Sequence, residues 1–422
     1  MTAKLGRPQF FLIYLLLMLS AISIGIMISL LPVVARTAKI PDILIVTAQA
    51  ITAGSWILVA GFWSRIAQRR GRKFVIMVGS LGLCLGCAGT GGVIWIAVMN
   101  LLAPLAVLAI LVIARIANGA VGLAVVPAAQ AFVVERTDVR RRTVVMSSLA
   151  SAQALGTILG PAAAPFMTHV PGLGLAGPMV IVAAICALML PLLAFILPHD
   201  GPASQALADK AGTVAENQGI WRMKAVRGYL IYSTIMATAA IGLIQTIGFL
   251  VLDTVHGPAE VGQFWVGQAI AAGALATLVV QLGLTPFFKP TPRQMMLIAP
   301  LVSMLGLALL CLLPSYGLIV IATIIANAGF ALGRPGVATA ASLSLPLDRQ
   351  TELAAAILST ASAGVVIGPV LAVALYTIWQ PLPFALLALT QAAAFIIALR
   401  SDETSYSSAR EVIARDDSAT LG

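Results

Sequence analysis

The sequence predicts an all-α membrane protein, with twelve transmembrane helices arranged as two pseudo-symmetric six-helix bundles. Three observations lead to this fold class. Hydrophobic residues make up 60% of the 422 residues and charged residues only 9%, whereas a soluble domain carries about 25% charged residues. The apolar residues form runs of about 20 or more, which is the length that crosses a bilayer as a helix. The second half of the chain also repeats features of the first half.

Twelve apolar runs define the predicted spans. A helix is the expected form of each, because lipid offers no hydrogen-bond partner to backbone groups. The spans lie at 9–34, 45–67, 74–98, 105–133, 143–167, 175–197, 228–252, 260–286, 294–313, 317–342, 351–377 and 382–400. The longest polar interruption follows the sixth span. We therefore expect an N-terminal six-helix bundle at 1–197, a cytoplasmic linker at 198–227, a C-terminal bundle at 228–400 and a cytoplasmic tail at 401–422.

The basic residues predict the orientation of the spans. Most of the 25 Lys and Arg residues lie in segments on one side of the predicted membrane, and only Arg36 and Lys39 lie on the other. Positive loops stay in the cytoplasm, so we expect a multi-pass protein of the bacterial inner membrane with both termini cytoplasmic. The net charge of +10 is spread over these short loops. No basic domain interleaved with aromatic residues is present, which argues against a nucleic-acid partner.

The repeat has a constant offset of 208 residues. It aligns Pro127 with Pro335, Gly156 with Gly364, Gly160 with Gly368 and Pro161 with Pro369. Repeats of six helices related by an axis along the membrane normal are a transporter architecture, in which substrate binds near the midplane between the halves.

The loop after the second span resembles a known motif. It reads Ser-Arg-Ile-Ala-Gln-Arg-Arg-Gly-Arg-Lys over residues 64–73, and is similar to the G-x-L-A-D-R-x-G-R-K loop of the major facilitator superfamily. Arg69, Gly71, Arg72 and Lys73 match, whereas Ser64 and Gln68 depart from the motif. The resemblance implies a secondary transporter. In that family the motif's Asp latches the loop to the second half, and Gln68 lacks this charge.

Spans four and five extend the resemblance. Arg115, Gly119, Pro127 and Glu135 are similar to the family's R-x-x-x-G followed by Pro and an acidic residue, and we expect Arg72 to pair with Glu135. An arginine inside a span is functional by default, although a structural role is equally open. The stretch Gly156-Thr-Ile-Leu-Gly160-Pro161 resembles the antiporter motif G-x-x-x-G-P-x-x-G-G, with Ala164 and Pro165 in place of the last two glycines. It favours the drug:proton antiporter branch over ordinary small-residue packing.

The remaining candidates lie at the predicted cavity and at helix ends. The candidate substrate-binding residues, many of them amides that can bind varied ligands, are Tyr14, Met27, Gln49, Gln153, Gln245, Gln268, Asn327 and Arg334. Arg334 either contacts substrate or extends to lipid headgroups. Asp253, near His256 and Glu260, is either a coupling residue or part of a solvated loop. No carboxylate lies near the middle of a predicted span, so proton coupling would require Asp253, Glu135 or a charge-balancing arginine, or a substrate that itself carries the proton.

Together these features predict a monomeric exporter of small organic molecules driven by proton antiport. A siderophore or organic-anion metabolite exporter is one alternative, because two arginines are embedded in spans and Arg334 would contact the anion. A proton-coupled nutrient importer of the same fold is another. We expect no enzyme, since there is neither an HExxH motif nor a Ser/His/Asp set. We also expect no cofactor and no metal, because the pair Cys84 and Cys87 lacks a second pair of ligands.

Overall fold

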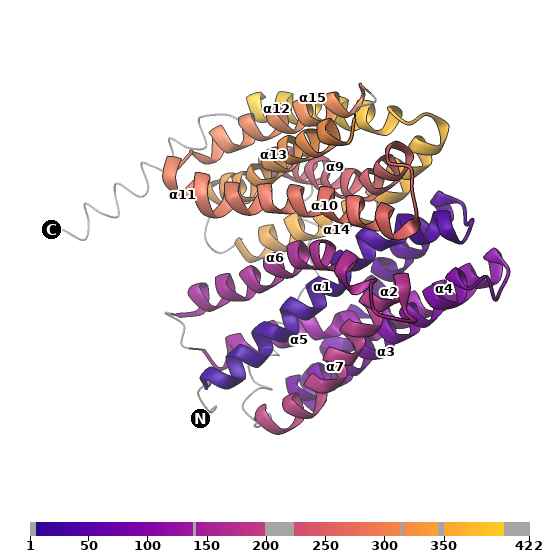
Figure 1. Ribbon diagram of the computed structural model, residues 1–422. Coiled ribbons are helices and arrows are strands. Elements are labelled where there is room, and N and C mark those ends of the chain that lie inside the picture. Colours follow the sequence, from indigo (N-terminus) through magenta and orange to yellow (C-terminus); the bar gives the residue numbers. More distant parts are fainter. Residues whose placement is uncertain (1–5, 138–140, 199–222, 313–314, 345–349, 401–422) are drawn as a thin grey trace. The chain divides into compact units, whose positions relative to one another are not determined.

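A computed structural model describes residues 6–137, 141–198, 223–312, 315–344 and 350–400. These residues contain no strand, which confirms the predicted all-α class. The predicted tail at 401–422 and most of the predicted linker lie outside the described residues. Each predicted span corresponds to one helical segment, so twelve segments are present in the described part (Figure 1).

The first six segments follow one another from residue 7 to residue 196. They are α1 (Arg7–Thr37), α2 (Asp42–Arg70), α3 (Arg72–Val98), α4 (Pro104–Val121) continuing through the 3₁₀ turn η1 (Gly122–Ala124) into α5 (Val125–Glu135), α6 (Arg142–Met167), and η3 (Gly174–Ala176) leading into α7 (Gly177–Ile196). Pro127 explains why the fourth segment is interrupted. Proline cannot donate to the carbonyl four residues earlier, and its ring crowds that carbonyl, so the preceding turn tightens.

The other six segments run from residue 224 to residue 400. They are α9 (Lys224–Thr254), α10 (Ala259–Leu278) continuing through the π-helical turn η6 (Val279–Leu284) into α11 (Thr285–Phe288), α12 (Pro292–Leu310), α13 (Tyr316–Leu343), α14 (Gln350–Ile378) and α15 (Leu382–Arg400). Among the described helices, ten segments are long and apolar enough to cross a membrane by length and composition. α6 and α14 are the other two of the twelve.

Local signals explain where several helices begin. A capping box opens α12: the Thr291 hydroxyl accepts a hydrogen bond from the Gln294 amide at 3.3 Å, and the Gln294 side chain accepts one from the Thr291 amide at 2.8 Å. Gly71 separates α2 from α3 with φ +92°. This backbone conformation is rarely open to residues with a Cβ, so the glycine of the loop motif allows the reversal that the sequence predicted.

The chain divides into two compact units, which do not coincide with its two sequence halves. One unit takes in Met1–Gly212 and Ile244–Ala271, and the other takes in Thr213–Leu243 and Ala272–Gly422. The end of α9 and the first part of α10 therefore pack with helices of the first half. The predicted division at the linker 198–227 stays a prediction.

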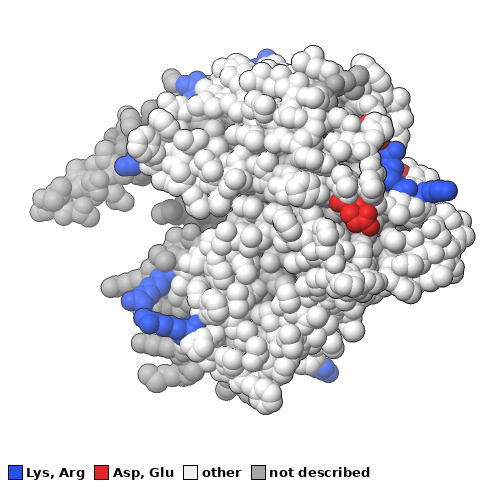
Figure 2. All heavy atoms as spheres, in the orientation of Figure 1, with Lys and Arg blue, Asp and Glu red and all other residues white. Residues whose placement is uncertain are grey.

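The surface agrees with a membrane environment. Many large apolar side chains are exposed on the helices, among them Leu58 (86% exposed), Phe195 (89%) and Leu188 (72%). On the face shown in Figure 2, uncharged surface dominates and the few charged side chains are gathered in small groups. Exposed apolar patches of this kind are unusual in soluble monomers, which supports lipid as the solvent for the helices.

Candidate functional site

A buried arginine lies near the middle of the fourth segment. Arg115 is 6% exposed and follows the start of α4 by eleven residues, which is roughly 17 Å along the helix at 1.5 Å per residue. Two side chains of α2 hold its guanidinium. Its Nε donates to the Thr52 hydroxyl at 3.0 Å and its Nη2 donates to Gln49 Oε1 at 2.7 Å. The polar side chains of α2 thus position a cation inside the first unit.

Both acceptors of Arg115 are neutral. Among the described residues, Arg115 forms no ion pair, and the carboxylates of the described helices lie at or near helix ends rather than in mid-span. A buried charge without a counterion is costly, and hydrogen bonds only partly offset that cost. Within the described residues, the charge of Arg115 is therefore held by hydrogen bonds to neutral groups alone.

The interface between α2 and α4 is polar along more than one turn. Trp63 Nε1 donates to the Ala120 carbonyl at 2.5 Å, just before the 3₁₀ turn. Gly119 packs directly on the backbone of Thr52, since a Cβ there would meet the Thr52 carbonyl carbon at 3.0 Å and the carbonyl oxygen and Ser55 hydroxyl more closely still. This close approach, made possible by Gly119, brings Thr52 and Gln49 within reach of Arg115.

A second charged cluster joins the loop motif to the end of α5. Arg72 pairs with Glu135 through both Nε and Nη2, each 2.9 Å from Glu135 Oε1, so the predicted pairing is confirmed. Arg136 lies 4.0 Å from the other oxygen of Glu135, and its guanidinium lies over the Phe132 ring at 3.7 Å. Half-buried surroundings strengthen such charge-assisted contacts relative to open solvent.

Lys73 binds the end of a different helix. Its Nζ donates to the carbonyls of Ala194 and Leu197, at 2.7 Å and 2.6 Å, at the C-terminus of α7. These carbonyls lack partners within the helix and carry the negative end of its dipole, so a cation is favoured there. Gln68 is half-buried, and Arg69 is exposed. The gating role expected for the loop motif stays a prediction.

The antiporter-like stretch of α6 lies against α1. A Cβ at Gly160 would lie 2.5 Å from the Ile22 carbonyl oxygen and 3.0 Å from the Ile26 amide. A Cβ at Gly156 would meet the backbone of Met18 and Ile22. Pro161 in turn contacts α1 at Gly25, where a Cβ would lie 2.8 Å from the proline ring. All three motif residues therefore make helix contacts in the first unit.

The predicted cavity residues are dispersed. In the first unit, Gln153 accepts a hydrogen bond from Gln130 at 3.2 Å. Gln245 and Met27 are buried, at 5% and 1% exposed, and Tyr14 and Gln268 are half-buried.

In the second unit, the Asn327 side-chain amide donates to the Thr323 carbonyl at 2.9 Å. Arg334 is exposed and, within the described part of the chain, forms no hydrogen bond or ion pair. Of the candidate substrate-binding residues, Gln49 contacts another predicted site residue, Arg115, and a role for this pair in substrate binding stays a prediction.

Comparison with known proteins decides the family. The Major Facilitator Superfamily model matches residues 13–302, more than half of the chain. The chain belongs to the major facilitator superfamily. It is therefore a secondary transporter rather than an enzyme, and a multi-pass membrane protein. No curated protein matches this sequence significantly.

Solved structures of superfamily transporters share the fold. A point mutant of the nucleoside transporter NupG is 12% identical, with a TM-score of 0.74 over 93% of this chain and 100% of that one. The xylose transporter XylE from E. coli, in an inward open conformation, is 13% identical, with a TM-score of 0.66 over 92% and 95%. A POT family transporter in complex with a thioalcohol-conjugated peptide is 13% identical, with a TM-score of 0.65 over 94% and 96%. At such identities the likeness shows the fold alone.

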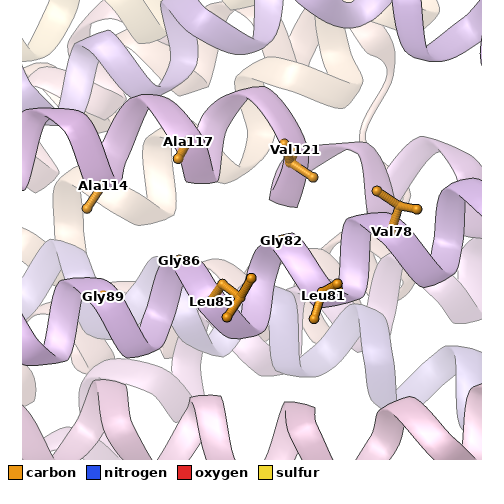
Figure 3. A pocket seen from close by; sticks show the side chains of 9 residues that line it. All are labelled: Val78, Leu81, Gly82, Leu85, Gly86, Gly89, Ala114, Ala117 and Val121. Atoms are coloured by element: carbon orange, nitrogen blue, oxygen red, sulfur yellow. The ribbon is translucent and has the colours of Figure 1, made fainter.

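A groove of about 350 Å³ lies between α3 and α4 of this superfamily member (Figure 3). It is lined by small and aliphatic residues: Val78, Leu81, Gly82, Leu85, Gly86, Gly89, Ala114, Ala117 and Val121. Leu81 and Leu85 are 45% and 62% exposed. The lining offers no side-chain hydrogen-bond donor, so the groove suits apolar lipid rather than a polar substrate.

Sequence reasoning missed two groups of contacts in the first unit. One is the hydrogen bonding of Arg115. Its acceptor Thr52 could not be recognised from the sequence, because a threonine within an apolar run gives no sign of a partner. The other is Arg36, which pairs with Asp42 at 2.9 Å and with Asp253 at 3.1 Å. The available signal was that Arg36 is one of only two basic residues on its predicted side. His256 and Glu260, which the sequence places near Asp253, are exposed and form no hydrogen bond or ion pair with it.

Proposed function

We propose that this superfamily member exports small organic molecules by alternating access, coupled to proton antiport. The observation that carries the proposal is the α6 stretch from Gly156 to Pro161, whose two glycines and proline lie against α1. Close packing of small residues lets two helices meet along their backbones, and the same stretch resembles the antiporter motif. Nucleoside and xylose transporters share the fold, but they do not indicate the direction of transport here.

The proposal includes an orientation and an assembly state. Lys and Arg residues predominate in the loops on the side of the Arg72 and Lys73 motif, which supports a cytoplasmic location for that side and for both termini. We further propose the bacterial inner membrane as the location and a monomer as the working unit.

A second candidate is the export of organic anions, including siderophores and acidic metabolites. Arg115 favours this candidate, because its buried charge meets only the neutral Gln49 and Thr52 among the described residues. An anionic group would supply the missing countercharge. The exposed Arg334 offers a second cation without a described partner, in the second unit.

The test is proton flux in proteoliposomes. Purified protein is reconstituted with a pH-sensitive dye inside, and acidic, neutral and basic organic compounds are added in turn. Antiport predicts that a transported compound drives protons in the direction opposite to its own. Proton movement in the same direction as the compound would show an importer of the symport type. Compound movement without proton movement would exclude proton coupling.

A further inference from the structure

Two cysteines from different helices lie against each other in the first unit. Cys84 Sγ on α3 donates to the Ala183 carbonyl of α7 at 3.4 Å. Cys186 Sγ on α7 donates to the Ser80 carbonyl of α3 at 3.3 Å. The two thiols also form a hydrogen-bond contact with each other. In the sequence Cys84 is paired with Cys87, one turn further along the same helix, but the structure brings it to a cysteine of another helix.

The backbones of α3 and α7 come close enough to hold this pair of thiols in place. A Cβ at Gly91 of α3 would lie 2.9 Å from Val180 Cγ2 and 3.3 Å from Met179 Cβ on α7. Gly91 follows Cys84 in the chain, whereas Val180 precedes Cys186. This is the register of two antiparallel neighbours, so the two cysteines belong to a packed helix pair rather than to helix ends.

The pair lies near the middle of both helices, next to surface that faces lipid. Cys84 lies about halfway along α3, and Cys186 about halfway along α7. Cys186 is buried and Cys84 is half-buried. Their chain neighbours Leu85 and Ile185 are 62% and 41% exposed. A reagent therefore reaches the thiols across apolar surface, where a neutral species enters more easily than a hydrated ion.

The number of ligands limits which metal ion the pair can hold. Among the described residues, no group of three or more His, Cys, Asp or Glu side chains is placed to share an ion. A structural zinc ion takes four such ligands, so the pair does not make a zinc site. Soft ions prefer thiolates, and the soft ions Hg²⁺, Ag⁺ and Cu⁺ are stable with two sulfur ligands in line. Two cysteines complete the coordination of an ion of this class.

The charge of the complex distinguishes between these soft ions. Two thiolates neutralise Hg²⁺, whereas they leave a net negative charge on Ag⁺ or Cu⁺. Such a charge is costly in the middle of a membrane span. The buried cation Arg115 interacts electrostatically with Cys87, and in the described part of the chain it has no such interaction with the Cys84 and Cys186 pair. The neutral complex of the divalent ion is therefore favoured.

We propose that Cys84 and Cys186 form a two-coordinate site for a soft divalent cation of the Hg²⁺ type. The ion arrives from the lipid side as a neutral dihalide. Each thiol loses its proton as an S–Hg bond replaces the S–H bond, and two protons and two halide ions leave. No atom changes its oxidation state. The bound ion joins α3 to α7, which both lie in the first unit, so the site does not depend on the substrate or the direction of transport.

Retention of mercury against a competing thiol tests the site in the full chain. Purified protein receives one equivalent of HgCl₂ and then a small excess of 2-mercaptoethanol, and native mass spectrometry counts the bound ions. We expect the wild type to keep one ion per chain, because two positioned thiolates act together. Cys84→Ser and Cys186→Ser should each lose the ion. Serine keeps a hydroxyl that can donate to the same carbonyl, so the helix contact is retained.

Two further serine variants are the controls. Cys311→Ser removes a half-buried thiol that donates to the Leu307 carbonyl at 3.5 Å on α12, and Cys87→Ser removes the partner suggested by the sequence. Both variants should keep the ion. An ion that binds the folded state stabilises it, so HgCl₂ should raise the melting temperature of the wild type and of both controls, but not that of Cys84→Ser or Cys186→Ser. Gel filtration establishes that each variant is folded.

Three results would overturn the proposal. The first is a wild type that loses mercury to the monothiol. The second is a Cys84→Ser or Cys186→Ser variant that keeps it, or a Cys87→Ser variant that loses it. The third is a peptide map of the purified chain in which a disulfide already joins Cys84 to Cys186, since the pair would then have no thiols to offer. Proton flux is measured separately, so failure of the antiport proposal leaves these results unaffected.

Discussion

Arg115 carries a charge into the middle of a membrane helix, where two neutral acceptors on α2 hold it. Gln49 and Thr52 satisfy two of its five donor hydrogens and leave its charge uncompensated among the described residues. The buried charge therefore depends on neutral hydrogen-bond acceptors in the described part of the chain, at a cost in stability.

Replacing Arg115 with lysine tests whether the fork of two hydrogen bonds positions the side chain. An ammonium group keeps the charge, but it is a compact point charge that does not reproduce the planar fork of the guanidinium. We expect Arg115→Lys to lower the free energy of unfolding by about 1.5–3 kcal/mol, the range for a hydrogen bond to a charged group. Thermal unfolding in detergent measures the change. Arg65→Lys, at an exposed position of α2, is the matched control and should leave the melting temperature unchanged.

Arg334 is the second cation to test, because it is exposed on α13 and has no described partner. If it contacts an anionic substrate, Arg334→Gln should weaken binding of an acidic compound by about 1.5–3 kcal/mol, while binding of a neutral compound is retained. Calorimetry with one acidic and one neutral transported compound measures the difference. Equal losses for both compounds would assign Arg334 a structural role, and no loss for either would leave it as a side chain that extends to lipid headgroups.

The sequence was enough to pick out the charged residues of the candidate sites, but not most of the residues that contact them. Arg115 and Glu135 stand out because charges are rare in apolar runs, and the pairing of Arg72 with Glu135 followed from the family motif. Thr52, Arg36 and Asp42 could not be assigned in the same way. Their roles depend on which helices meet, and neither periodicity nor composition determines that at the level of single side chains.

At the scale of helices, α6 and α14 use the same contacts in the two units. Gly156 and Gly160 of α6 lie on the backbone of α1, while Gly364 and Gly368 of α14 lie on the backbone of α9 at Ala237 and Thr238. The repeat in the sequence predicted that these glycines are equivalent. The repeat could not predict which helices these glycines contact. A glycine has no side chain, so any neighbouring helix can approach it closely. The structure shows that the repeated feature is a pair of helices in close contact.

A methyl group at Gly160 should separate this pair of helices. The new Cβ would meet the Ile22 carbonyl and the Ile26 amide, and backbone cannot move aside as a flexible side chain does. We expect Gly160→Ala to lower stability by about 1–3 kcal/mol, as overpacking of a core does. Gly92→Ala on α3 is the control, because no atom lies within 4 Å of its added Cβ and alanine favours a helix. Melting temperatures that change equally in both variants would contradict the role of the close contact.

At the scale of the whole chain, composition and run length sufficed for the twelve helices. Lipid leaves few alternatives to a helix for a long apolar run, so the predicted spans and the observed segments agree closely. The grouping of Ile244–Ala271 with the first unit was beyond such reasoning. It depends on contacts such as those of Gly248 with Pro32 and Gly267 with Pro161, which join residues far apart in the chain and leave no pattern in composition or periodicity.

The orientation of the chain is the prediction that follows from charge alone. Lys and Arg predominate in the loops on one side, and Arg36 and Lys39 are the only basic residues on the other. The positive-inside rule then places the termini in the cytoplasm. Reporter fusions at residue 210 and at the C-terminus should be active as cytoplasmic reporters, and a fusion at His256 should be active as an external one. Because six spans precede residue 210 and a seventh separates it from His256, a matching signal at 210 and 256 would mean that one span is miscounted. External signals at both 210 and the C-terminus, with a cytoplasmic signal at 256, would reverse the orientation and place Asp253 on the cytoplasmic side.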